Sequence, residues 1–291
     1  CIKERLIMGF RVVNEPPKPP VKARKRARRA DGKVKKILFI SAGALALGAA
    51  GLGGTTAYNL VSVKSASASA QKVALNKPAN VASMATIAAQ ASKLDYGSNN
   101  HGIPSAKQLE AYQNLPEKVY GRGFIAVPKQ QGVTQPITSL AINEGASDKV
   151  LAVGAGTPRA GEMMGDGNFS VAAHNFGNDE TYFSPMQRNV DVNAKPKVCV
   201  TDGKRLFTYQ FNKTSDDVSG RTVVNYRQGS VLDDSVGKGK AILTLITCDE
   251  PGLFTLHPEN RLLLRAHLVS SEPISQATDA EKALFPQIFN T

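Results

Sequence analysis

The sequence predicts an all-β domain preceded by one membrane-spanning helix. Short segments rich in β-branched and aromatic residues recur through residues 119–270, separated by Gly, Pro, Asn and Asp. That spacing is typical of a β-barrel or sandwich rather than of alternating strands and helices. Before this region, residues 37–63 form an uncharged run bounded by lysines, which indicates a membrane helix.

The first part of the chain, residues 1–36, is a basic tail. It holds thirteen Lys/Arg and three Asp/Glu and so carries +10 of the net charge of +12. Basic blocks such as residues 22–29 occur in nucleic-acid-binding proteins, but this one stands directly before an uncharged segment, as the positive-inside rule requires of a cytoplasmic tail. We therefore expect no nucleic-acid partner. Cys1 stands where an initiator methionine would be expected, Met8 is an alternative start, and Cys1 receives no role.

The uncharged segment, residues 37–63, is predicted to be a transmembrane anchor. As a helix it would span roughly 40 Å, more than the roughly 30 Å of a bilayer's hydrocarbon core. Small residues at 65–70 also suit a signal-peptide cleavage site, so a removed secretory signal is the alternative. A signal's apolar region is usually about 7 to 15 residues, which favours the uncleaved anchor. In either case the rest of the chain is exported.

Two further parts flank the domain. Residues 64–118 are dominated by Ala, Ser, Asn, Gln and Lys and are expected to form an extracellular linker. Within it, Ser105 and Gln108 have the spacing of a capping box and predict a short helix through Tyr112. Beyond residue 270 the chain turns polar again, and residues 271–291 are expected to form a loosely packed C-terminal tail.

The domain proper is assigned to residues 119–270. Its strands are expected at residues 124–127, 170–173, 198–201, 206–211, 241–248 and 261–269. The run over residues 241–248 ends on Cys248 and is followed at once by the turn formers Pro251 and Gly252. If it pairs with residues 261–269 as an antiparallel hairpin, Cys248 and Arg261 lie side by side.

That juxtaposition places a thiol beside a permanent cation. A neighbouring cation favours the thiolate, the form that attacks carbonyl groups. His174 follows the strand at residues 170–173 much as Cys248 ends its own strand. Three strand ends thus supply a nucleophile, a proton-transfer group and an anion stabiliser, the parts of an acyl-transfer site. Arg261 is expected at an open sheet edge with little core packing.

These residues carry a family resemblance. Residues 244–248, Thr-Leu-Ile-Thr-Cys, resemble the Thr-Leu-x-Thr-Cys signature of the sortases, and Arg261 matches that family's catalytic arginine. Further similarity runs back through Val-Ala-Ala-His at 171–174, Gly-Asp-Gly-Asn-Phe at 165–169 and Gly-Arg-Gly-Phe-Ile-Ala-Val-Pro at 121–128. The resemblance covers roughly residues 119–270 and is strongest to class A. One departure is Ala173, where the family often has glycine.

The resemblance implies an eight-stranded sortase-like β-barrel with short helices and no cofactor. It implies a membrane-anchored cysteine transpeptidase of a Gram-positive surface that cleaves LPXTG-type sorting signals between Thr and Gly. Its partners would be LPXTG-bearing surface proteins and an amine of a cell-wall precursor. His174, Cys248 and Arg261 would be catalytic, and Ala172 and Thr247, which adjoin them in sequence, would line the substrate groove.

Two other classes of protein explain the sequence less well, a non-catalytic binding domain and a papain-like protease. A tethered, non-catalytic β-domain that binds wall or surface proteins explains the anchor and the strands, but not three reactive residues at strand ends. A papain-like protease would place its cysteine before its histidine, the reverse of the order here.

Two further sets of residues receive no catalytic or metal role. Cys199 alternates within a probable strand and is expected to be buried. Scattered loop carboxylates that resemble a sortase calcium site (Glu144, Asp148, Asp233 and Asp234) support no metal assignment.

Overall fold

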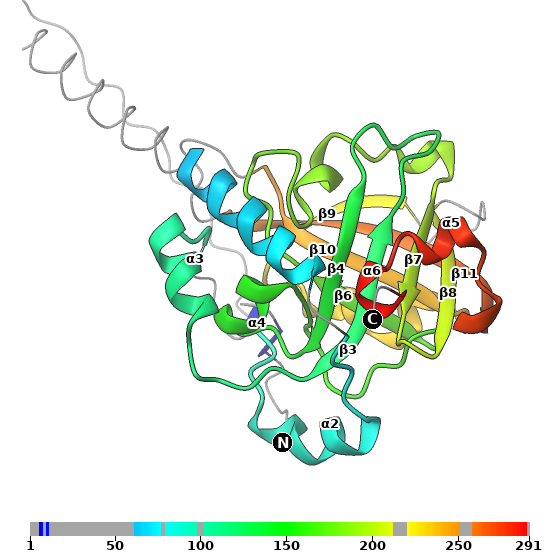
Figure 1. The fold of residues 1–291 in the computed structure, drawn as a ribbon, viewed down its shortest axis with the longest axis horizontal. Helices are drawn as coiled ribbons and strands as arrows, with labels where there is room; N and C mark the ends of the chain where they lie inside the picture. Colours follow the sequence, from blue (N-terminus) through cyan, green and yellow to red (C-terminus); the bar gives the residue numbers. More distant parts are fainter. Residues whose placement is uncertain are drawn as a thin grey trace, which may run out of the picture.

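The computed structural model describes residues 61–76, 79–97, 102–211, 220–250 and 258–289, together with two short N-terminal strands (Figure 1). Apart from those two strands, the predicted basic tail lies outside the described residues, as do Cys1 and most of the predicted anchor, residues 37–60. The strands are β1 (Leu6–Ile7), β2 (Phe10–Arg11), β3 (Gly121–Val127), β4 (Ile137–Glu144), β5 (Ala155–Thr157), β6 (Asn168–Ala172), β7 (Lys197–Thr201), β8 (Arg205–Phe211), β9 (Gly220–Asn225), β10 (Ile242–Cys248) and β11 (Asn260–Pro273).

Most helices are short, and they lie between the strands or after the last one. The α-helices with assigned bounds are α2 (Met84–Gln90), α3 (Ala106–Gln113), α4 (Asp148–Val153), α5 (Asp279–Lys282) and α6 (Pro286–Phe289). The 3₁₀ turns are η1 (Ala91–Lys93), η2 (Ser184–Gln187), η3 (Val192–Ala194), η4 (Gly229–Leu232), η5 (Asp234–Gly237) and η6 (Ile274–Gln276). The predicted capping box is confirmed, because Ser105 and Gln108 each satisfy the other's backbone N–H at the start of α3.

The sheet closes on itself. Its strand order runs β10-β6-β5-β4-β3-β7-β8-β11, and β11 pairs in turn with β10, which makes a ring of eight strands. Strand β11 is 14 residues long, so one of its edges accommodates β9 along its first half and β8 along its second. The predicted eight-stranded barrel with short helices is therefore confirmed, as is the predicted hairpin of β10 with β11.

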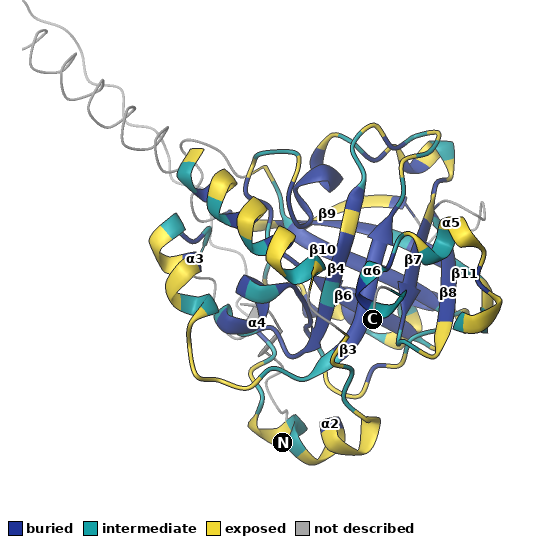
Figure 2. Cartoon of the chain, in the orientation of Figure 1, coloured by how far each residue is buried: buried dark blue, intermediate teal, exposed yellow. Residues whose placement is uncertain are grey.

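Alternation along β10 separates two apolar clusters. Leu243 and Leu245 point into the barrel and join the main core with the matching residues of β11, Leu262 and Leu264. Ile246 points the other way, into a smaller cluster on the outer surface of the sheet. Both faces of β10 are therefore buried, as Figure 2 shows for most of the barrel strands. This explains why β10 is an almost continuous apolar run in the sequence.

A helix over residues 61–75 packs against the barrel (Figure 1). Its buried residues Val63, Ser67 and Gln71 are four apart and so lie on one helical face. Ser67 Oγ lies 2.9 Å from Thr181 Oγ1, and Gln71 Oε1 accepts from the Tyr182 N–H at 3.3 Å. The predicted linker therefore begins with a helix that is docked on the domain.

The same helix includes the last three residues of the predicted membrane anchor, residues 61–63. Val63, the last residue assigned to the membrane segment, is 3% exposed and belongs to the domain core. Among the described residues there is no helix of the length and hydrophobicity that a bilayer crossing requires. The membrane segment over residues 37–63 remains a prediction for the part before residue 61.

The C-terminal residues also differ from expectation. Instead of ending near residue 270, β11 continues to Pro273, and α5 and α6 follow it. Phe285 is fully buried in a third apolar cluster with Phe124, Cys199 and Leu206. Apolar residues after residue 270, among them Ile274, Leu284 and Phe285, meet this outer face of β3, β7 and β8 and hold the segment in place.

The docked face of the N-terminal helix can be tested with a pair of serines. Ser67 is fully buried, so Ser67→Leu overfills its site and loses the Thr181 contact. We expect it to lower the free energy of unfolding by about 1 to 3 kcal/mol. Ser65 is exposed on the same helix, and Ser65→Leu should change stability by less than about 0.5 kcal/mol. Chemical denaturation of the full chain measures both, and equal effects would contradict the docking.

Candidate active site

Cys248 and Arg261 lie directly opposite each other in the structure. They are register partners at the end of the antiparallel β10–β11 pair. The hydrogen bond from the Asp249 N–H to the Asn260 carbonyl, 3.1 Å long, continues the pairing one step further. The cysteine and the arginine are thus held as cross-strand neighbours, as the hairpin prediction required.

His174 reaches the same end of the sheet from the other side of β10. Strands β6 and β10 are parallel, with Ala172 paired to Ile246. His174 and Cys248 each lie two residues beyond that pair, so they are level with each other. The Ala173 N–H donates to the Ile246 carbonyl at 3.1 Å, and Thr247 Oγ1 donates to the Ala173 carbonyl at 2.7 Å. The structure therefore gathers all three predicted catalytic residues at one end of adjacent strands.

The outer apolar cluster lies beneath Cys248 and Arg261. Because side chains alternate along a strand, Cys248 shares a face with Ile246, and Arg261 shares one with Leu263. Ile246 and Ala172 both belong to the outer cluster, together with Leu263, Val224, Val231 and Leu232. The candidate site is consequently on the outer surface of the barrel, above an apolar floor.

The two predicted groove residues lie on opposite faces. Ala172 is fully buried in that floor, on the face of the candidate site. Thr247 is also fully buried, but on the face that points into the barrel, with its hydroxyl bonded to the Ala173 carbonyl. Ala172 supports the site from below and Thr247 ties β10 to the His174 segment. Direct substrate contact by either residue remains a prediction.

Arg261 is more buried than the sequence indicated. It is only 3% exposed, and its Nη1 donates to the carbonyls of Pro258 at 2.8 Å and Asn260 at 3.0 Å. Its guanidinium also lies 5.7 Å from the centre of the Tyr226 ring, within the range of a cation–π contact. The sequence predicted an open edge here, but Tyr226 covers it. Tyr226 lies 35 positions before Arg261, so no local pattern indicated this contact. The cation is therefore fixed in place beside Cys248.

Aromatic rings surround the imidazole of His174. Phe176 lies 5.2 Å from it and Tyr182 lies 6.5 Å from it, measured between ring centres. The residue as a whole is half-buried. Burial lowers the pKa of His174 to about 4, with the Asp148 carboxylate raising the pKa and the Arg261 charge lowering it. At neutral pH the imidazole is neutral and can accept a proton.

Cys199 occupies a different environment from Cys248. It is 4% exposed in β7 and packs in the cluster around Phe285. Burial raises the pKa of the Cys199 thiol to about 11, so it stays a thiol at neutral pH. Cys248 is half-buried at a strand end. Of these two thiols only Cys248 lies beside a proton acceptor and a cation.

The loop carboxylates that resemble a calcium site interact with other side chains, as Glu144 and Asp234 show. Glu144 is 1% exposed and forms a buried ion pair with Arg122, and it also accepts from Tyr96 Oη at 3.0 Å. Asp234 binds Arg159 at 2.6 Å. No group of three or more His, Cys, Asp or Glu side chains suited to a metal ion occurs among the described residues.

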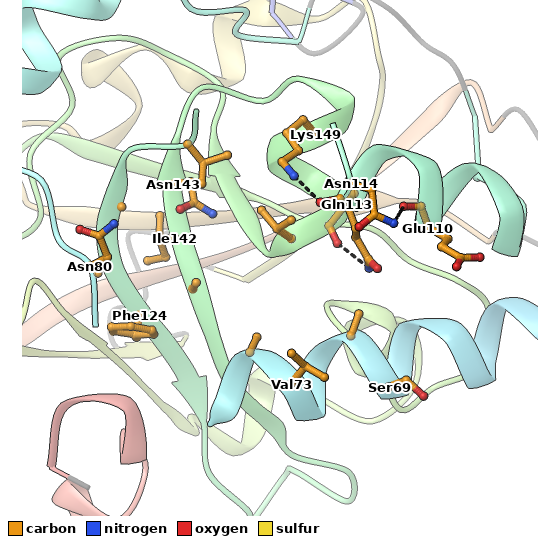
Figure 3. A pocket seen from close by; sticks show the side chains of 18 of the residues that line it. Ser69, Val73, Asn80, Glu110, Gln113, Asn114, Phe124, Ile142, Asn143 and Lys149 are labelled. Atoms are coloured by element: carbon orange, nitrogen blue, oxygen red, sulfur yellow. Dashed lines mark hydrogen bonds between the residues drawn. The ribbon is translucent and has the colours of Figure 1, made fainter. Parts of the chain in front are cut away.

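A large pocket elsewhere on the barrel is separate from this site. It has a volume of about 720 Å³ and lies between the helix of residues 61–75, α3, α4 and strands β3 and β4 (Figure 3). Its polar lining includes Asn143 and Lys149, whose Nζ donates to the Gln113 carbonyl. The lining contains no cysteine, no histidine and no Arg261, so the pocket lacks the groups needed for acyl transfer.

A closed barrel that brings a cysteine, a histidine and an arginine together at the ends of adjacent strands has the groups that an acyl-transfer site requires. Comparison with protein families matches residues 125–269 to the Sortase domain family. This domain belongs to the sortase family, whose members are cysteine transpeptidases. The matched segment includes His174, Cys248 and Arg261.

Two relatives and one solved structure give the extent of the similarity. Sortase A of Streptococcus agalactiae is 26% identical over 204 residues, which cover 68% of this chain and 73% of the relative. Sortase A of Listeria monocytogenes is 30% identical over 129 residues, 44% of this chain and half of that protein. The solved structure of Listeria monocytogenes sortase A is 26% identical, with a TM-score of 0.45, over 57% of this chain and 97% of that chain.

Titration of His174 tests its environment. Its NMR signals should titrate near pH 4, well below the ordinary histidine value of 6.5. Arg261→Met removes a cation and should raise the midpoint, whereas Asp148→Asn removes an anion and should lower it. Because the unfolded chain binds this proton near pH 6.5, the stability contributed by neutral His174 is complete above that pH and is lost as the pH falls toward 4. A midpoint near 6.5 would contradict the buried imidazole.

Proposed function

We propose that this protein is a class A-like sortase that cleaves LPXTG-type sorting signals between Thr and Gly. It would then join the surface protein to an amine of a cell-wall precursor. The observation that carries the proposal is the placement of His174, Cys248 and Arg261 at the same end of adjacent strands. The name Sortase A of the two relatives above supports the class, and the signature at residues 244–248 supports the substrate.

The first half of the reaction forms a thioacyl enzyme. Neutral His174 accepts the proton of the Cys248 thiol as the sulfur attacks the threonine carbonyl carbon. The carbonyl electron pair moves to oxygen, where the adjacent Arg261 charge stabilises it. The intermediate then collapses, the C–N bond breaks, and His174 gives its proton to the departing glycine amine. A low pKa makes the transient imidazolium a strong acid, which suits it to this donation.

The second half transfers the acyl group. The acceptor amine attacks the thioester carbonyl, and His174 accepts a proton from that amine. When the C–S bond breaks, the proton returns to the sulfur of Cys248. Each residue ends the cycle in its starting state. The apolar floor of Ala172, Ile246 and Leu263 keeps water away from one side of the thioester and favours transfer over hydrolysis.

The proposed location is the cell membrane, with a cytoplasmic N-terminus and an extracellular catalytic domain. The basic tail and the uncharged segment before residue 61 support this topology. Since the chain is already packed on the domain from residue 63, the domain would sit close to the membrane surface. The full protein should remain in the membrane fraction after a high-salt wash. A soluble form that begins near Gln71 would instead indicate a cleaved signal.

A fluorogenic LPXTG peptide tests the reaction itself. The full chain is incubated with the peptide, with and without an added amine such as triglycine. We expect cleavage in both cases and a new peptide–amine product only when the amine is present. Cleavage without that product would indicate a protease, and no cleavage would favour the alternative, a non-catalytic domain that binds wall or surface proteins.

Arg261→Lys tests the role of the cation. The substitution keeps the charge but loses the planar fork of donors. Loss of one oxyanion donor typically lowers turnover by about 10² to 10³, so we expect kcat to fall by that factor with little change in KM. The melting temperature should fall by a few degrees, because Arg261 Nη1 also binds the carbonyls of Pro258 and Asn260.

Arg265 in the same strand supplies the control. It pairs opposite Thr244, away from the strand end, and its Nη2 donates to the Val231 carbonyl at 3.3 Å. Arg265→Lys should keep a near-normal kcat. If Arg261→Lys also retains normal kcat, or loses activity only because it unfolds, Arg261 has no part in the mechanism.

A further inference from the structure

Asn175, the residue after His174, is bonded to the nucleophile's own backbone. Its side chain is 1% exposed, and its Nδ2 donates to the Cys248 carbonyl at 3.0 Å and to Gln187 Oε1 at 3.1 Å. Its Oδ1 accepts from the Gly177 N–H at 2.9 Å. Both ends of the amide therefore have partners of the correct polarity, which fixes its orientation. This side chain is the direct link between the His174 segment and Cys248.

Gln187 extends that link to the loop after Cys248. It is the last residue of η2 and is 8% exposed. Its Nε2 donates to Asp249 Oδ1, and its Oε1 accepts from the Glu250 N–H, each at 3.1 Å. Glu250 has a φ of +41°, a left-handed conformation that L-residues seldom adopt without external support. Gln187 thus holds the unusual turn that directly follows the nucleophile.

The element that presents Gln187 is itself anchored on two sides. Arg221 of β9 donates from Nη1 to the Met186 carbonyl at 2.8 Å and from Nη2 to the Gln187 carbonyl at 2.9 Å. The Phe183 N–H donates to the His174 carbonyl at 3.1 Å. Because η2 is fixed both to the sheet and to the His174 segment, the Gln187 side chain has a stable base.

We propose that Asn175 and Gln187 are positioning residues that hold the His174 imidazole and the Cys248 thiol at a productive separation. The assignment rests on the proposed roles of His174 and Cys248. The register of β6 with β10 ends at Ala172, and both reacting side chains lie beyond it. The two amides continue the connection where the backbone ladder has stopped. Misplacement by about 1 Å can cost about 100-fold in rate, so this connection controls turnover.

The test uses the full chain and two peptide substrates. One carries the ordinary Thr–Gly amide, and the other carries a thioester at that bond. An amine must be protonated by His174 as it leaves, whereas a thiolate, whose conjugate thiol has a pKa near 8.5, leaves without that help. Both substrates need His174 to accept the Cys248 proton, and only the amide also needs His174 to protonate the leaving group, so a misplaced imidazole slows the amide more than the thioester.

We expect Gln187→Leu and Asn175→Ala each to lower kcat on the amide about 10- to 100-fold, with KM within about twofold. On the thioester each loss should be at least about fivefold smaller than on the amide, because one of the two proton transfers is no longer required. The double variant should be little worse than the poorer single one, because the two side chains share a hydrogen bond. His174→Ala, run alongside, should show the same preference for the thioester.

Gln287→Leu is the matched control. Gln287 is a glutamine of α6 that is 3% exposed, and its hydrogen bonds go to Ser139 and Ala79. This variant should keep kcat within twofold on both substrates.

Equal losses on amide and thioester for Gln187→Leu, a loss confined to KM, or no loss at all would each overturn the assignment. If the wild-type chain cleaves neither substrate, or if His174→Ala shows no preference for the thioester, the proposed function is wrong. The positioning role of Asn175 and Gln187 is then wrong as well.

Discussion

The parallel pairing of β6 with β10 is the constraint on which the candidate site depends. It sets His174 level with Cys248, and the antiparallel pairing of β10 with β11 sets Arg261 opposite Cys248 from the other side. A shift of one residue in either register would turn a reacting side chain to the opposite face of the sheet. The closed ring of eight strands resists such a shift, because every strand is bonded on both sides.

Burial gives the three residues their chemical character. The aromatic rings beside His174 keep the imidazole neutral at physiological pH, and Tyr226 with two loop carbonyls holds the guanidinium of Arg261. The outer apolar cluster lies directly below, so charge developing at the site is screened less than it would be in water. A neutral base and a fixed cation on either side of a thiol suit an acyl transfer that proceeds at neutral pH.

Much of the barrel was predictable because its local signals agree. The β-branched run that ends on Cys248, the turn residues after it and the apolar run from Arg261 predict the hairpin, and the structure confirms it. The capping box at Ser105 predicts α3 for the same reason. The ends of the domain were less predictable. Residues 61–75 are rich in small residues and residues 271–291 mix polar with apolar side chains, yet both segments pack on the barrel through side chains such as Val63 and Phe285.

The sequence by itself determined the all-β class and the hairpin that pairs Cys248 with Arg261, because alternation and turn chemistry act over a few neighbouring positions. The resemblance to sortases added the closed barrel and the three candidate catalytic residues. Only the tertiary structure decided what surrounds them. The burial of Arg261 against Tyr226 and the bonds from Asn175 and Gln187 to the Cys248 loop join residues that are 35 to 73 positions apart. No local pattern encodes such contacts, since they arise when β6, β9, β10 and β11 meet at one end of a closed sheet.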